Sequence, residues 1–136
     1  MDTPNFHMAD GAPMPTGPFC HAAEIDGWIF LTGQTPLDPY DAAAPIPDGI
    51  ENQTHLVFQN LKTVLMSLNL GFEHVVRMGV YLTHLEEDFE PFNQVYQTYF
   101  PNGGLPARTC VGVASLVRDP RVEIDCVARR PVASHA

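Results

Sequence analysis

One short segment places an arginine where it could bind an anion. Arg108 lies in the run PARTCV (106–111), directly after a loop rich in glycine and proline. If this run is a strand, alternate side chains share one face, and Arg108 and Cys110 point the same way. A guanidinium group can form two parallel hydrogen bonds with a carboxylate. The segment therefore predicts either a carboxylate clamp or a structural ion pair between Arg108 and Glu123 or another acid.

Glu123 is the acid that could act on a ligand held by Arg108. It lies in the run VEIDC (122–126) of the following predicted strand. A carboxylate beside a bound substrate can position and deprotonate a water molecule. If strands 108–116 and 121–129 pair as a hairpin, Glu123 comes near the Arg108 end of the sheet only with some stagger. The alternative is an ordinary polar side chain on the outer face of an edge strand.

Two other sets of reactive side chains carry weaker signals. Cys110 could be a nucleophile, but no His–Asp pair is placed to activate it, which favours a small buried side chain lining the site. His84, Glu86 and Asp88 could hold a metal ion, although this acidic run also suits the start of a helix. The sequence contains no GxGxxG, P-loop, HExxH or GxSxG motif. The residues therefore give no motif for a nucleotide, a zinc ion or a serine nucleophile.

The composition limits the partners that the protein can have. The chain has 136 residues, which fits one domain. Its 16 acidic and 7 basic residues give a net charge of −9, which disfavours binding to nucleic acid or to anionic membranes. No apolar run is long enough for a transmembrane helix. Three scattered cysteines and an N-terminus without the features of a signal peptide predict a cytoplasmic protein with reduced thiols.

The hydrophobic pattern predicts a single domain over 1–136 with the element order β-β-α-β-α-β-β. The expected elements are a hairpin over 21–32, a helix over 50–70, a strand over 74–82, a helix over 88–100 and strands over 108–116 and 121–129. An irregular arm (1–15), a long loop (34–49) and a loose tail (131–136) complete the chain. This order favours an α+β fold with both helices on one face of the sheet. Trp28 and Phe30 would make the other face apolar, which suggests that an oligomer covers it.

Six short motifs stand along the chain in an order found in one protein family. They are GPFCHA (17–22), FLTGQ (30–34), NL (60–61), FEPFN (89–93) with Tyr96 and Phe100, PARTCV (106–111) and VEI (122–124). Together they resemble the reactive-intermediate deaminase (Rid) proteins, also called the YjgF-like or L-PSP-type family. The resemblance covers roughly 15–130, and PARTCV followed by VEI is its most specific part.

The resemblance implies a fold, an assembly and an activity. Family members have a chorismate-mutase-like mixed sheet with two helices packed on one face. They form homotrimers whose sheets make an inner barrel, with active sites in clefts between subunits. Their known reaction is the hydrolysis of 2-enamines or 2-imines to 2-keto acids and ammonia, without a metal or organic cofactor.

The resemblance also implies roles for particular residues. Arg108 would hold the substrate carboxylate, and Glu123 would orient the attacking water. Further contacts with the substrate are implied for Cys110, Phe19, Thr32, Gly33, Phe89 and Asn93. In the best-attested deaminases a tyrosine stands where this chain has Phe19, so the phenol hydroxyl is missing here, and His21 is a candidate to compensate.

These departures leave three functions open. The first is a deaminase for small 2-imino acids, and the second is a pathway-specific deaminase for a larger substrate such as an aminomuconate-type intermediate. The third is a regulatory trimer that binds a keto acid without turnover. A ribonuclease role fits poorly with a net charge of −9.

Overall fold

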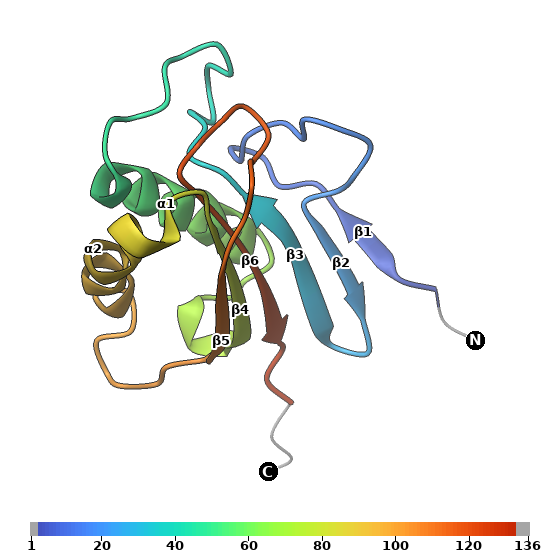
Figure 1. Cartoon of the computed structure of the whole chain (residues 1–136). Coiled ribbons are helices and arrows are strands. Elements are labelled where there is room, and N and C mark those ends of the chain that lie inside the picture. Colours follow the sequence, from blue (N-terminus) through green and yellow to red (C-terminus); the bar gives the residue numbers. More distant parts are fainter. Residues whose placement is uncertain (1–2, 133–136) are drawn as a thin grey trace.

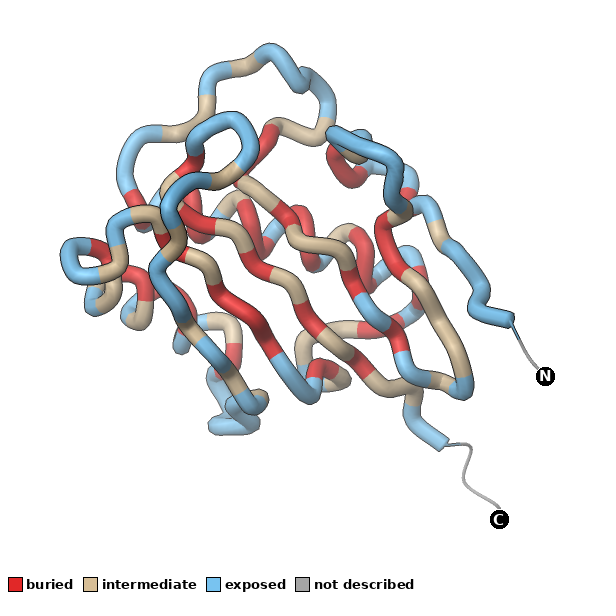
Figure 2. The backbone as a smooth tube through the Cα atoms, turned by 45° about the vertical axis from the view of Figure 1, so that its right-hand side comes forward, coloured by how far each residue is buried: buried red, intermediate tan, exposed pale blue. Residues whose placement is uncertain are grey.

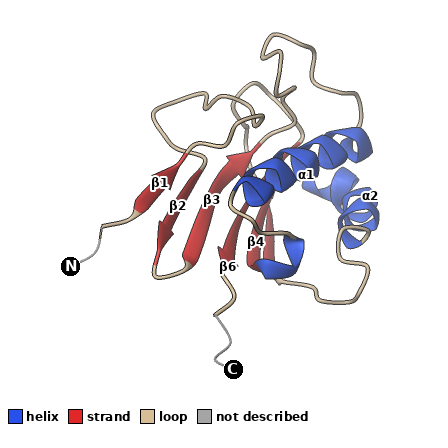
Figure 3. Ribbon diagram, turned by 180° about the vertical axis from the view of Figure 1, so that it is seen from behind, coloured by secondary structure: helices blue, strands red, loops and turns tan. Residues whose placement is uncertain are grey.

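A six-stranded mixed sheet with two α-helices on one of its faces forms the fold (Figure 1, Figure 3). The structure is a computed structural model and describes residues 3–132. Its strands are β1 (Asn5–His7), β2 (Ala22–Ile25), β3 (Trp28–Gln34), β4 (Val75–Leu82), β5 (Ala107–Gly112) and β6 (Val122–Arg129). Its helices are α1 (Ile50–Ser67) and α2 (Leu85–Gln97), with a short 3-10 turn, η1, over Phe72–His74. This arrangement confirms the predicted α+β class with helices on one face.

The order of strands across the sheet differs from the hairpin considered for the last two strands. The order is β1-β2-β3-β6-β4-β5, so β6 lies between β3 and β4 and is antiparallel to both. β5 is at the edge and runs parallel to β4. Parallel neighbours need a crossover connection, which is usually helical, and α2 supplies it here. The hairpin pairing is therefore wrong, and β4 separates the strands that carry Arg108 and Glu123.

Several element boundaries also differ from those expected. The arm over 1–15 is not wholly irregular, because β1 pairs with β2 at the sheet edge. A strand of 3 residues shows too little alternation to be detected in the sequence. The second helix begins at Leu85 rather than Asp88, and the strand predicted over 108–116 ends at Gly112. Residues 133–136 of the expected loose tail lie outside the described residues.

The helices and the sheet bury one apolar core between them. Val122, Ile124, Cys126 and Ala128 alternate along β6 and are at most 2% exposed. The apolar stripe of α1, which includes Leu61, covers them. Burying each aliphatic side chain of this size contributes about 1.5–3 kcal/mol. The core therefore fixes β6 and sends its intervening side chains, Glu123 among them, to the other face. Among residues 3–132, no helix combines the length and apolarity needed to cross a membrane.

The face of the sheet away from the helices carries exposed aromatic side chains. Trp28 and Phe30 of β3 are 42% and 50% exposed, whereas Ile29 between them is fully buried. Figure 2 shows the same alternation of burial along the strands. Contiguous apolar surface of this kind is typical of a protein–protein contact. Coverage of this open face by an oligomer stays a prediction.

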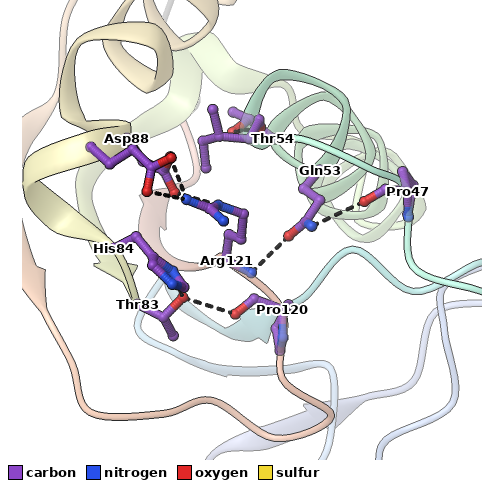
Figure 4. Close-up of polar contacts among 10 residues, drawn as sticks. Pro47, Gln53, Thr54, Thr83, His84, Asp88, Pro120 and Arg121 are labelled. Atoms are coloured by element: carbon purple, nitrogen blue, oxygen red, sulfur yellow. Dashed lines mark hydrogen bonds and ion pairs between the residues drawn. The ribbon is translucent and has the colours of Figure 1, made fainter.

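Arg121 connects the start of β6 to both helices (Figure 4). Its guanidinium donates to the two carboxylate oxygens of Asp88 at 2.7 and 3.0 Å. Its backbone N–H donates to Oε1 of Gln53 in α1 at 2.7 Å, and Gln53 in turn donates to the carbonyl of Pro47 at 3.0 Å. This network holds the chain immediately before Glu123.

We expect Asp88→Ala to lower the free energy of unfolding by about 3 kcal/mol, because removing one partner of a buried ion pair leaves the charge of the other without a partner. The Asp88 side chain is only 4% exposed. Glu87→Ala is the matched control, since Glu87 contacts the same guanidinium at 3.1 Å but is 72% exposed. Its cost should stay below about 1 kcal/mol. Urea denaturation of both variants measures the difference, and equal losses would contradict the assignment.

Candidate active site

Four of the predicted site residues line one pocket at the end of the sheet where β3 ends and β6 begins. They are Phe19, Thr32, Gly33 and Glu123. The arm over 13–16 and the loop that carries Arg118 supply much of the remaining wall. The structure thus brings together segments that are far apart in the sequence, and we call this hollow the Glu123 pocket.

An irregularity in β3 shapes the Glu123 pocket. The pairing of β3 with β6 shifts by one residue between Leu31 and Gln34, which leaves an extra residue in β3 around Thr32 and Gly33. Bulges of this kind are frequent beside active sites because they redirect the chain. A Cβ atom on Gly33 would collide with the carboxylate of Glu123. Glycine at this position therefore leaves space for that carboxylate in the pocket wall.

The surroundings of Glu123 make its carboxylate a stronger base than usual. Burial raises the pKa of Glu123 above its ordinary value of 4.5, and the negative charge of nearby Asp125 raises it further. Asp125 itself accepts a hydrogen bond from the hydroxyl of Tyr81 at 3.0 Å. A carboxylate with a raised pKa accepts a proton from water more readily. Glu123 is therefore suited to general base catalysis.

Arg108 lies in a second, separate hollow against α2. Its Nη1 donates to Oδ1 of Asn93 at 2.9 Å. Its guanidinium carbon lies 5.9 Å from the ring centroid of Phe89, 5.8 Å from that of Phe92 and 4.8 Å from that of Tyr96. Each cation–π contact contributes about 0.5–1 kcal/mol at an exposed site. We call Asn93 and these three rings the Arg108 cage.

The Arg108 cage holds a cation without neutralising it. No acidic side chain among residues 3–132 forms an ion pair with Arg108. The alternative of a structural ion pair, with Glu123 or another of these acids, is therefore wrong. Because the cage is built from an amide and aromatic rings, the positive charge remains uncompensated. A planar cation held in this way suits the carboxylate of a ligand.

Cys110 lies on the same face of β5 as Arg108, as predicted, and packs against the core. Burial raises the pKa of the Cys110 thiol, and the charge of Arg108 lowers it by less. The thiol is therefore protonated at neutral pH, when only a thiolate is a good nucleophile. This environment argues against Cys110 as a nucleophile, and its role as a lining side chain stays a prediction.

The Glu123 pocket and the Arg108 cage lie on opposite faces of the sheet. Arg108 pairs in register with Met78, which is fully buried beneath the helices. Glu123 pairs with Tyr81, which faces the open side of the sheet, since Val80 and Leu82 on either side of it are fully buried. The two strands are also separated by β4, at about 4.8 Å per strand spacing. One copy of the chain therefore does not present both groups to the same small ligand.

His21 holds the arm that forms one wall of the Glu123 pocket. It is 2% exposed, and its Nδ1 accepts a hydrogen bond from the Ala9 backbone N–H at 2.8 Å. With Nδ1 accepting, Nε2 carries the proton and donates to the Pro13 carbonyl at 2.8 Å. Both ring nitrogens are used by the backbone, so His21 does not replace the hydroxyl that Phe19 lacks.

Sequence reasoning missed Arg118 as a site residue. The run RDP (118–120) falls between the predicted strands 108–116 and 121–129, so its position in the sequence indicates a connection rather than a binding residue. The structure places Arg118 in the wall of the Glu123 pocket, where its Nη1 donates to the Ala42 carbonyl at 2.7 Å. The available signal was a basic residue close in sequence to the candidate acid, in a chain with only 7 Lys and Arg.

The acidic run at the start of α2 is occupied by other contacts. Asp88 binds Arg121, and Nδ1 of His84 lies 3.0 Å from Oγ1 of Thr83. Within the described range 3–132, no three His, Cys, Asp or Glu side chains come together as metal ligands would. The carboxylates instead occupy the first turn of a helix, where negative charge is favourable.

Comparison with known proteins decides the family. The family model described as Endoribonuclease L-PSP matches residues 9–130. The chain belongs to this family. It is the Rid or YjgF-like family that the sequence motifs resemble. Among L-PSP relatives, the RutC family protein slr0709 of Synechocystis is 41% identical over 120 residues, which are 88% of this chain and 92% of that protein.

Two further matches come from L-PSP proteins whose names or titles are more informative. The mouse 2-iminobutanoate/2-iminopropanoate deaminase is 37% identical over 117 residues, which are 86% of this chain and 84% of that protein. The crystal structure of Escherichia coli TdcF with bound serine is 29% identical, with a TM-score of 0.83, and the match covers 92% of this chain and 99% of that chain. The mixed sheet with two helices is therefore the fold of solved L-PSP-family structures.

Proposed function

We propose that this protein hydrolyses small 2-imino acids, and their 2-enamino tautomers, to 2-keto acids and ammonia. The observation that carries the proposal is a caged Arg108 without an acidic partner, in a chain whose Glu123 has a raised pKa in a pocket. The mouse relative is named as a deaminase of such imines, and the TdcF structure holds an amino acid. A ribonuclease activity is not proposed, because a net charge of −9 disfavours phosphate binding.

The reaction needs positioning more than activation, because a protonated imine is already electrophilic. Arg108 binds the substrate carboxylate and fixes the C=N carbon relative to the water. Glu123 accepts a proton from this water as its oxygen bonds to the imine carbon, which gives a carbinolamine. Glu123 then gives this proton to the amine nitrogen. As the C–N bond breaks and ammonia leaves, the carbinolamine hydroxyl loses its proton through Glu123 to the departing ammonia, and the C=O bond of the keto acid forms. Positioning of this kind can supply about 7–11 kcal/mol in favourable cases.

The proposed site is shared between copies of the chain. Because the Arg108 cage and the Glu123 pocket face opposite sides of the sheet, a substrate in the Glu123 pocket would meet the partner subunit's Arg108. The apolar open face, with Trp28 and Phe30, supplies a surface for such an assembly. A ring of identical head-to-tail contacts gives each copy one neighbour on either side. We propose a homotrimer with one site at each contact.

Mixing two inactive variants tests the shared site. Arg108→Ala and Glu123→Gln are each expected to be inactive, but copies mixed in equal amounts and reassembled should regain activity. In a random ring, about one quarter of the sites combine an intact arginine with an intact glutamate from a neighbour. We therefore expect about one quarter of the wild-type rate, measured as ammonia released from imines made by an amino-acid oxidase. No recovery, with trimers verified by light scattering, would place both residues in one copy's site and overturn the shared geometry.

The raised pKa of Glu123 predicts the acid side of the pH profile. The base must be ionised, so the rate should fall as the pH decreases through a pKa above the ordinary 4.5. Asp125→Asn removes the negative charge that raises this pKa and should move the fall to lower pH without changing the plateau. The kcat/KM profile of both proteins measures this effect. An unchanged midpoint in Asp125→Asn would contradict the electrostatic account.

A further inference from the structure

The Glu123 pocket contains a cation, Arg118, that the proposed reaction does not use. We propose that Arg118 binds the distal carboxylate of the substrate, so that the preferred substrates are 2-imino acids with a second carboxylate. This inference rests on the proposed function. It assigns the 2-carboxylate to the partner subunit's Arg108 and the far end of the molecule to Arg118.

The position of Arg118 is set by the loop before β6. Arg118 lines the same pocket as Glu123, Gly33 and Phe19. Its backbone φ is 66°, in the left-handed region that non-glycine residues rarely adopt. Its Nη1 donates to the Ala42 carbonyl at 2.7 Å, which ties it to the loop after β3. The guanidinium is therefore positioned by a neutral acceptor, as Arg108 is.

The charge of Arg118 is also uncompensated. Among residues 3–132, no carboxylate forms an ion pair with it. The neighbouring acids Glu123 and Asp38 line the hollows on its two sides, and Asp38 Oδ1 accepts the backbone N–H of Tyr40 at 2.8 Å. In a protein of net charge −9, a dianion needs such a cation to enter. A monocarboxylate gains nothing from it.

The hollow around Arg118 extends past the Glu123 pocket. A second hollow continues from the Glu123 pocket, shares Arg118 and Leu37 with it, and extends to Tyr40. Its walls include the exposed side chains of Met14 and Tyr40. Arg118 lines both hollows, whereas Glu123 lines only the first. This is the arrangement that a longer substrate with a terminal carboxylate would occupy.

Matched substrates of equal chain length test the proposal. The probes are 2-iminoglutarate and 2-iminopentanoate, made in place by oxidation of glutamate and norvaline. We expect Arg118→Gln to lower kcat/KM for 2-iminoglutarate by about 10- to 100-fold, the loss of a charge-assisted hydrogen bond, and mainly through KM. The loss with 2-iminopentanoate should be much smaller, because that substrate has no distal carboxylate. Arg118→Lys should restore part of the dicarboxylate rate because it keeps the charge.

The control and the contrary outcomes separate this inference from the proposed function. Lys62→Gln removes the same charge from an exposed site on α1 outside the groove and should affect both substrates equally and weakly. Equal losses on both imines in Arg118→Gln would make Arg118 a residue that only shapes the loop, and would overturn the proposal. If the wild type hydrolyses neither imine, the proposed function fails. In that case the Arg118 assignment is tested by calorimetry, which measures the affinities of the protein for 2-oxoglutarate and for 2-oxopentanoate. Equal affinities for the two keto acids would refute the assignment.

Discussion

Arg108→Ala is expected to lower kcat/KM for imine hydrolysis by about 100- to 1,000-fold, since losing one partner of a desolvated charge pair costs about 2–5 kcal/mol. The substrate carboxylate would lose its cation, and the imine carbon would no longer be fixed relative to the water. The measurement is the rate of ammonia or keto acid formation with 2-iminopropanoate and 2-iminobutanoate. The effect should appear in both kcat and KM, because the anchor serves binding and orientation.

Arg108→Lys provides the control for charge alone. A lysine keeps the positive charge but cannot form the planar two-bond contact with a carboxylate, and it stacks less well on Tyr96 of the Arg108 cage. We expect an activity between those of the wild type and Arg108→Ala. Wild-type rates in both variants would remove the carboxylate clamp from the mechanism. Binding of a keto acid with no turnover in the wild type would instead favour a regulatory, non-catalytic protein.

Glu123→Gln is expected to lower kcat by about 100- to 10,000-fold, the usual contribution of a general base, with little change in KM. The amide has the same shape as the carboxylate but does not accept a proton. Because Gly33 leaves space for either group, the pocket should remain intact. The acid limb of the pH profile should disappear together with the activity. Asp125→Asn, on the same strand and face, is the control and should retain the plateau rate. A Glu123→Gln variant that keeps its kcat would assign the water to another group.

Local pattern accounted for most of the elements and for one half of the site. The alternation in PARTCV correctly placed Arg108 and Cys110 on one face of a strand, and the helical period of 50–70 indicated α1. These features depend on neighbours within a few residues, so the sequence carries them directly. Motif resemblance then selected the residues that the structure brings into two clusters.

Long-range pairing could not be predicted in the same way. Nothing local indicates that β6 inserts between β3 and β4, and this insertion puts β4 between the strands that carry Glu123 and Arg108. The bulge at Thr32 and Gly33 depends on the partner strand as well as on the glycine. The role of His21 depends on two backbone groups of an arm that has no periodic pattern. Each of these features is a tertiary contact that a single sequence does not encode in its spacing.

The division of the two charged groups between the faces of the sheet has a consequence for how the catalyst responds to dilution. In the proposed homotrimer, a solitary copy would hold every required side chain but no complete catalytic centre. Turnover per mole of chain should therefore fall sharply once the solution is dilute enough for the copies to dissociate. The specific activity would then increase with the concentration of the protein.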